Sequence, residues 1–216
     1  MSKHDHTAIP GAKDLGLLSI GVVGIGTSGP IIAARIMPVP SLIFWRTLGG
    51  ALMMLPFALR RAEWRTKDQQ RAIAWSALAG FFLAMHFICF FLAMRYTSVA
   101  TGTALTALQP IFAAIYFKVR GGIIPSRAWS GMFIAFLSVA LITGIDFQIS
   151  MRNFIGDLLA ILGAAMSASY VLIGSKAQQK LSTSTYTTAC YLTCAVTGLI
   201  IAVASGSQIF NFQAHQ

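Results

Sequence analysis

The sequence predicts an all-α membrane protein, a polytopic helical bundle with about seven transmembrane helices. Of its 216 residues, 56% are hydrophobic and only 10% are charged, whereas a soluble domain carries about 25% charged residues. The charges are clustered, and the apolar segments between clusters recur at close to the ~20 residues that a helix needs to cross a bilayer. Strands of a β-barrel alternate apolar and polar residues, and runs such as 81–85 (FFLAM) do not.

Seven apolar segments follow one another along the chain. The expected spans are 15–34, 41–59, 72–94, 98–117, 128–145, 158–175 and 187–204. In chain order, the charges that bound them are Asp14 and Arg35, Arg35 and Arg60, Arg71 and Arg95, Arg95 and Lys118, Arg127 and Asp146, Asp157 and Lys176, and for the seventh span Lys180 alone. The first span has no convincing cleavage region and more spans follow it, so we expect a retained helix rather than a signal peptide.

The distribution of lysine and arginine predicts the orientation. Twelve basic residues fall on the side of the N-terminus and only three on the other side. Because basic loops stay in the cytoplasm, we expect a cytoplasmic N-terminus and, with seven crossings, a C-terminus outside. The expected location is the inner (plasma) membrane of a bacterium. The net charge of +10 is therefore mainly a topology signal.

Several function classes find no support in the sequence. The basic stretch 60–71 lies between two spans, where it can touch anionic lipid but is badly placed for nucleic acid. The three cysteines, Cys89, Cys190 and Cys194, lie inside spans with no histidine or acid to complete a metal site. No nucleotide-binding or hydrolase motif is present, so we expect neither an enzyme nor a cofactor.

A weak internal repeat is visible at an offset of 143 residues. It places Asp14 on Asp157 and the small-residue run 21–29 on 164–172. Since the offset covers five helices, an odd number, the second copy has the opposite orientation. Inverted repeats of this kind are common in secondary transporters.

Four segments carry a resemblance to a known family. They are Ser41 to Arg46 (SLIFWR), Ala100 to Phe117 (ATGTALTALQPIFAAIYF), Trp129-Ser130-Gly131 with the apolar run after it, and Gly156 to Lys176, which begins with GDLLA. In order and spacing they resemble the EamA-type members of the drug/metabolite transporter superfamily, over residues 14 to about 204. The resemblance implies ten helices built as two inverted five-helix repeats.

The chain departs from this family pattern in two places. An acid that the family commonly carries between helices 4 and 5 would fall at Gly122. The chain also ends after helix 7, so we expect a truncated relative. The expected divisions are a cytoplasmic tail (1–13), a first five-helix repeat (14–147), a partial second repeat of two helices (148–204) and an outside tail (205–216).

Two titratable side chains inside spans are candidates for contact with a substrate. Arg46 is the one charge well within a span, about 8 Å from Ser41 along the helix. It either extends to the outer interface or faces a cavity that attracts anionic groups. His86 lies about 13 Å from Arg95. It is either a neutral histidine bonded between helices or a proton-coupling or substrate contact.

Two further candidates rest on polar groups in the middle of spans. Gln109 precedes Pro110, and a proline frees a backbone carbonyl one turn earlier. The pair forms either a packing kink or a substrate-lining site. Tyr170 offers a hydroxyl to a substrate or to a neighbouring helix. The glycines of the first span, up to Gly29, either permit close helix packing or flank a midplane cavity.

The sequence thus predicts a secondary transporter that moves a small organic metabolite or drug-like compound by alternating access. A truncated relative with a structural or assembly role is one alternative, and a ligand-sensing seven-helix protein is another. A retinal protein is excluded because 187–204 contains no lysine. The expected partners are a small-molecule substrate, the lipid bilayer and either a second copy of the chain or a complementing half, but no nucleic acid.

Overall fold

A computed structural model of the chain describes residue 11, residues 15–16, 19 and 22–23, and residues 37–210, with the helix backbone alone over 142–149. All the regular elements in this part are helices, as predicted. They are α3 (Val39–Arg61), α4 (Lys67–Tyr96), α5 (Val99–Thr106), α6 (Gln109–Val119), α7 (Ser126–Ile149), α8 (Met151–Gln178) and α9 (Thr183–Ala204). The predicted span 15–34 lies almost wholly outside the described residues.

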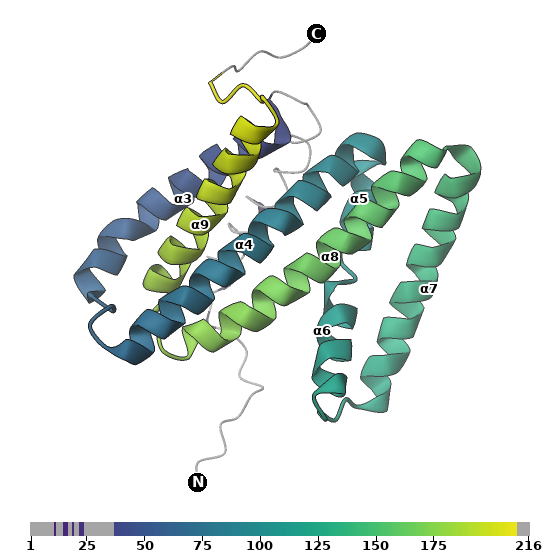
Figure 1. The fold of residues 1–216 in the computed structure, drawn as a ribbon. Helices are drawn as coiled ribbons and strands as arrows, with labels where there is room; N and C mark the ends of the chain where they lie inside the picture. The colour runs from purple at the N-terminus through teal and green to yellow at the C-terminus, as the bar shows by residue number, and fades with distance from the viewer. Residues whose placement is uncertain (1–10, 12–14, 17–18, 20–21, 24–36, 211–216) are drawn as a thin grey trace.

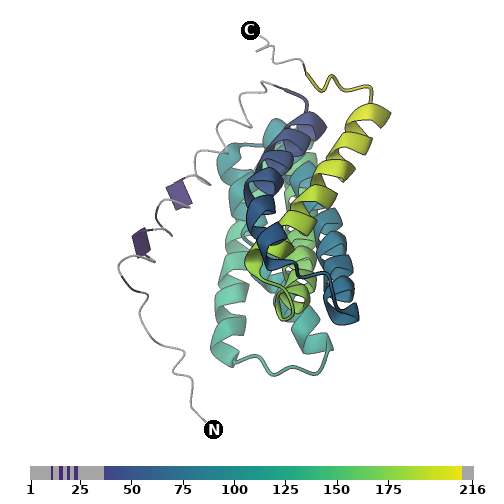
Figure 2. The same ribbon diagram turned by 90° about the vertical axis from the view of Figure 1, so that its left-hand side faces the viewer.

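Five segments of the described chain are long and apolar enough to cross a membrane. They are α3, α4, the pair α5 and α6 taken together, α8 and α9, while Ser126–Leu141 of α7 is a shorter apolar helix. The helices alternate in direction, and α4 and α8 lie side by side through the middle of the molecule (Figure 1). The helices α3 and α9 pack on one flank of this pair, and α5, α6 and α7 lie on the other, as Figure 2 shows from the side.

Most helices extend one or two turns beyond the predicted apolar spans, because side chains cap their ends. Thr66 and Gln69 form a reciprocal capping box at the start of α4, and the hydroxyls of Ser150 and Ser182 cap α8 and α9. Such caps satisfy backbone N–H groups in polar segments. The sixth span therefore begins at Met151 rather than at residue 158.

The predicted span 98–117 agrees with the apolar stretch Val99–Val119, which consists of two helices interrupted next to Gln109 and Pro110. The helix α5 ends at Thr106, and α6 begins at Gln109 with Pro110 in its first turn. Pro110 has no N–H to donate to the carbonyl of Thr106, and its ring clashes with a continuing helix. Short-range bonds, from Ala107 N–H to the Thr103 carbonyl and from Leu108 N–H to the Leu105 carbonyl, close the break.

The helices α3 and α9 pack together in opposite directions. At one end Ser41 Oγ and Trp45 Nε1 donate to the carbonyls of Gln208 and Ile209, both at 2.9 Å. At the other end, the segments 62–66 and 179–182 meet. The 143-residue offset carries 39–61 onto 182–204, so these two helices are equivalent in the predicted inverted repeat. The division of the chain into repeats stays a prediction.

We call the end of the bundle where α3 finishes and α9 starts the basic end. Its basic residues are Arg60, Arg61, Arg65, Lys67, Arg71, Lys118, Arg120, Arg127, Lys176 and Lys180.

Candidate functional site

Arg46 lies on α3 about 10 Å from the start of that helix, and its guanidinium lies against aromatic rings of α4. The guanidinium carbon is 4.8 Å from the centroid of the Phe87 ring and 5.8 Å from that of Phe91. Cation–π contacts of this kind attract a guanidinium to the faces of the rings. Among the described residues Arg46 has no hydrogen-bond or ion-pair partner, and its side chain is exposed. Its N–H donors therefore remain available to a ligand.

The helix α9 forms the other side of this neighbourhood. Tyr191 and Cys194 are close enough to Arg46 to interact with it electrostatically. One turn beyond Arg46, the backbone at Gly50 packs against the Tyr191 ring, where a Cβ would lie 2.7 Å from a ring carbon. The Arg46 neighbourhood is thus aromatic, with one cation and one phenol.

His86 faces α8 rather than α3. Its Nδ1 lies 2.8 Å from the carbonyl oxygen of Gly163, and because a carbonyl only accepts, Nδ1 carries the proton and Nε2 is left as an acceptor. The imidazole stacks on Phe90 with centroids 5.6 Å apart, and its residue is 9% exposed. Phe87, whose ring centroid is 5.3 Å from that of His86, lies between His86 and Arg46.

Gln109 stands at the break between α5 and α6. Its carbonyl oxygen accepts a hydrogen bond from Ser167 Oγ of α8 at 2.9 Å. Discontinuous membrane helices place polar groups at midplane sites in transporters. Here the Ser167–Gln109 hydrogen bond connects the break between α5 and α6 to α8.

Tyr170 also lies on α8, close enough to Tyr186 of α9 for the two hydroxyls to interact. Tyr186 is 4% exposed and its hydroxyl lies against Gly174, where any Cβ would overlap it.

The structure gathers three of the four predicted residues along one helix. Gly163, Ser167 and Tyr170 are spaced i, i+4 and i+7 on α8, so they share a face. His86 and Gln109 contact the first two of these positions, and Tyr170 is the third. Arg46 lies on α3, in contact with the Phe87 ring and close enough to His86 to interact with it electrostatically.

Sequence reasoning missed two carboxylates. Asp157 was taken as the boundary of a span, but it lies in the second turn of α8 and is 0% exposed. Arg46 is therefore not the only charge inside a span. The apolar residues Phe154 and Ile155, which precede Asp157, were the signal that the helix had already begun.

The second is Glu63, in the loop after α3. Its carboxylate accepts from the backbone N–H and the hydroxyl of Ser182, at 2.9 and 2.7 Å. Burial opposes ionisation, but the bonds from Thr185 and Ser182 outweigh it, and with the nearby charge of Arg61 they hold the pKa of Glu63 below its ordinary value. The α3–α4 loop is thereby fastened to the start of α9.

Fold and site together define a multi-pass α-helical membrane protein with polar and charged side chains at its helix contacts. The model of the EamA-like transporter family matches residues 15–144, more than half of the chain. The chain belongs to that family.

Two curated relatives agree with this assignment. An uncharacterized transporter of Archaeoglobus fulgidus is 32% identical over 100 residues, 45% of this chain and 34% of the relative. The uncharacterized transporter YxxF of Bacillus subtilis is 26% identical over 162 residues, 72% of this chain and 51% of the relative. The chain spans about half or less of the length of these relatives. No solved structure matches it significantly. Family and relatives point to a membrane transporter rather than an enzyme.

Proposed function

We propose that this chain acts as a secondary transporter that moves a small organic metabolite or drug-like compound by alternating access. Arg46 and the α8 face that carries Ser167 and Tyr170 would line the path, with His86 and Gln109 contributing to it. The observation that carries this proposal is the Arg46 guanidinium, held on two aromatic rings inside a membrane-spanning helix. A charge at that depth is costly to maintain and marks functional paths.

The arrangement favours a substrate with an anionic group and an apolar body. The guanidinium can form a bidentate contact with a carboxylate or phosphate, and Phe87, Phe91 and Tyr191 offer apolar contact around it. The break at Gln109 provides a place where α5 and α6 can move separately against α8. Coupling to an ion gradient, with His86 as a proton carrier, completes the proposal.

The proposed setting is the inner membrane of a bacterium, with the basic end in the cytoplasm. The excess of twelve basic residues over three supports this orientation. A second copy of the chain, or a complementing half, is the proposed protein partner.

Substitution of Arg46 tests the proposed path. In a strain that lacks the gene, uptake and efflux profiling first identifies a compound whose distribution changes when the wild-type chain is expressed. We expect Arg46→Ala to lower that transport at least about tenfold, the usual cost of losing a contact to a charged group. Arg46→Lys should not restore transport, because a lysine ammonium cannot reproduce the planar guanidinium that stacks on the rings and offers two parallel N–H donors.

A matched control is available at the end of α6. The guanidinium of Arg120 lies 5.2 Å from the Tyr116 ring but at the basic end, and Arg120→Ala should transport like wild type. Thermal melting of each purified variant separates loss of function from loss of fold. Well-folded Arg46→Ala protein with normal transport would contradict the proposed role.

A further inference from the structure

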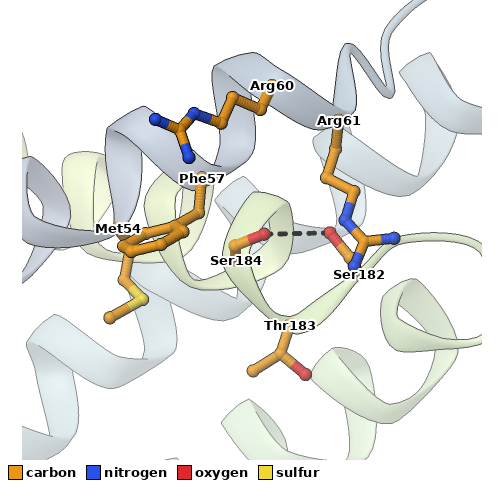
Figure 3. A pocket seen from close by; sticks show the side chains of 7 residues that line it. All are labelled: Met54, Phe57, Arg60, Arg61, Ser182, Thr183 and Ser184. Carbon is orange, nitrogen blue, oxygen red and sulfur yellow. Dashed lines mark hydrogen bonds between the residues drawn. The ribbon is translucent and has the colours of Figure 1, made fainter.

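A cavity of about 710 Å³ opens at the basic end, between the last turns of α3 and the first turn of α9 (Figure 3). Its α3 residues lie about 12 to 22 Å along the helix from Arg46, so it is separate from the proposed transport path. The residues that line it are Met54, Phe57, Arg60, Arg61, Ser182, Thr183 and Ser184.

The lining changes from apolar to cationic along the axis of α3. Met54 and Phe57 form the apolar wall, and Phe57 is 56% exposed. Arg60 and Arg61 follow Phe57 by three and four residues, which places them one turn nearer the end of the helix on the same face. The cavity thus passes from a hydrocarbon-like wall to two guanidiniums at the level where a spanning helix leaves the membrane.

The two arginines that line the cavity have no acidic residue among the other lining residues. Glu63 lies beside the cavity, but its carboxylate accepts two hydrogen bonds from Ser182 and also interacts with Thr185 and Arg61. Arg60 has no ion-pair partner in the part of the chain that the structure describes. Two guanidiniums against one engaged carboxylate leave a net positive rim. The hydroxyl of Ser184 lies 3.1 Å from Ser182 Oγ, whose own proton is donated to Glu63.

We propose that this cavity binds an anionic phospholipid, with its phosphate on Arg60 and Arg61 and an acyl chain along Met54 and Phe57. Guanidinium pairs bind phosphate oxygens bidentately, and anionic lipid gathers at basic segments next to membrane helices. The order of the lining, apolar and then cationic toward the helix end, matches the order of acyl chain and headgroup in a bilayer leaflet. A free inorganic anion would make no favourable contact with the apolar wall of Met54 and Phe57.

Lipid retention by the purified full chain tests this site. Native mass spectrometry of protein released from mixed phosphatidylglycerol and phosphatidylcholine micelles measures how many lipids of each kind stay bound. We expect the wild type to retain one phosphatidylglycerol in preference to phosphatidylcholine. The double variant Arg60→Gln/Arg61→Gln should lower that preference about 25-fold, the product of about fivefold for each basic residue.

The matched control removes the same charge from the same end but away from the cavity. Arg65→Gln/Arg71→Gln should keep the preference, since neither residue lines the cavity. An equal loss in both double variants would overturn the proposal in favour of diffuse attraction. Displacement of the lipid by millimolar inorganic phosphate would overturn it in favour of a simple anion site. A melting curve for each variant establishes that the compared proteins are folded.

Discussion

The two flanks of the α4–α8 pair are equally helical and apolar, yet they bury their side chains to different extents. On one flank, α9 has eight buried residues, among them Tyr186, Cys190 and Cys194. On the other, α5 has three buried residues, but α6 has none, and Val139 is the one buried side chain among those described in α7. Apolarity therefore does not predict burial here, because lipid solvates an apolar helix as well as protein does.

What distinguishes the buried flank is the presence of small residues at the contacts. Gly80 of α4 lies directly against the backbone of α9, where a Cβ would overlap the Cys190 carbonyl. Gly198 of α9 similarly lies against Ile43 and Phe44 of α3. Gly131 of α7, by contrast, has nothing within 4 Å of the position where its Cβ would be. Small residues let helix backbones approach closely, which is the main source of association between membrane helices.

The largest expected effect comes from filling one of these contacts. Gly80→Leu should destabilise the protein by about 3 kcal/mol or prevent its accumulation, because the obstructing atoms belong to backbone that cannot rotate away. Gly131→Leu, the same change on the exposed flank, should leave stability unchanged. Thermal melting in detergent measures both. Equal melting temperatures for the two variants would refute the difference between the flanks.

The order and approximate positions of the described spans were predictable because each crossing needs a fixed length of apolar sequence. Which helices lie beside one another, and through which residues, could not be predicted. His86 bonds to Gly163, 77 residues away, and Glu63 bonds to Ser182, 119 residues away. A helix that is apolar all round has no sequence period that indicates which face meets which partner.

The candidate site shows the same limit. A polar residue inside a span can be identified from sequence, as Arg46, His86, Gln109 and Tyr170 were, because its cost in hydrocarbon demands a partner. That Phe87 separates Arg46 from His86 depends on the rotation of α4, which only packing fixes. Asp157 was missed because the start of α8 was placed where charges end rather than at its cap.

A smaller effect is expected at the bond that ties the α5–α6 break to α8. A double-mutant cycle of Gln109→Leu and Ser167→Ala should give a coupling energy of about 0.6 kcal/mol and at most about 1.7, the range for hydrogen bonds between membrane helices. Thr188→Val is the comparison on the buried flank, since the Thr188 hydroxyl donates to Ser184 of its own helix. Chemical unfolding in mixed micelles measures the cycle. A coupling energy of zero would mean that the break and α8 move independently.

The smallest expected effect is at Glu63, where the two loops of the basic end meet. Its pKa is held below the ordinary value in the folded state, so its contribution to stability is fully present above the unfolded pKa of about 4.3. That contribution is lost as the pH falls through the lower folded pKa, because the protonated carboxyl no longer accepts both bonds from Ser182. Glu63 is half-buried in a surface loop, and water screens its interactions, which keeps the contribution below about 1 kcal/mol.

Glu63→Gln should therefore melt slightly below wild type at neutral pH, and the difference should close as the pH is lowered below about 4. Asp68→Asn, which removes another carboxylate at the same end, should show no such convergence, because Asp68 is bonded to no other helix among the described residues. A difference that instead grew on acidification would mean that Glu63 is held as the neutral acid. The fastening of the α3–α4 loop to α9 would then be a hydrogen bond donated by the carboxyl, and opening the basic end would not require breaking a charged contact.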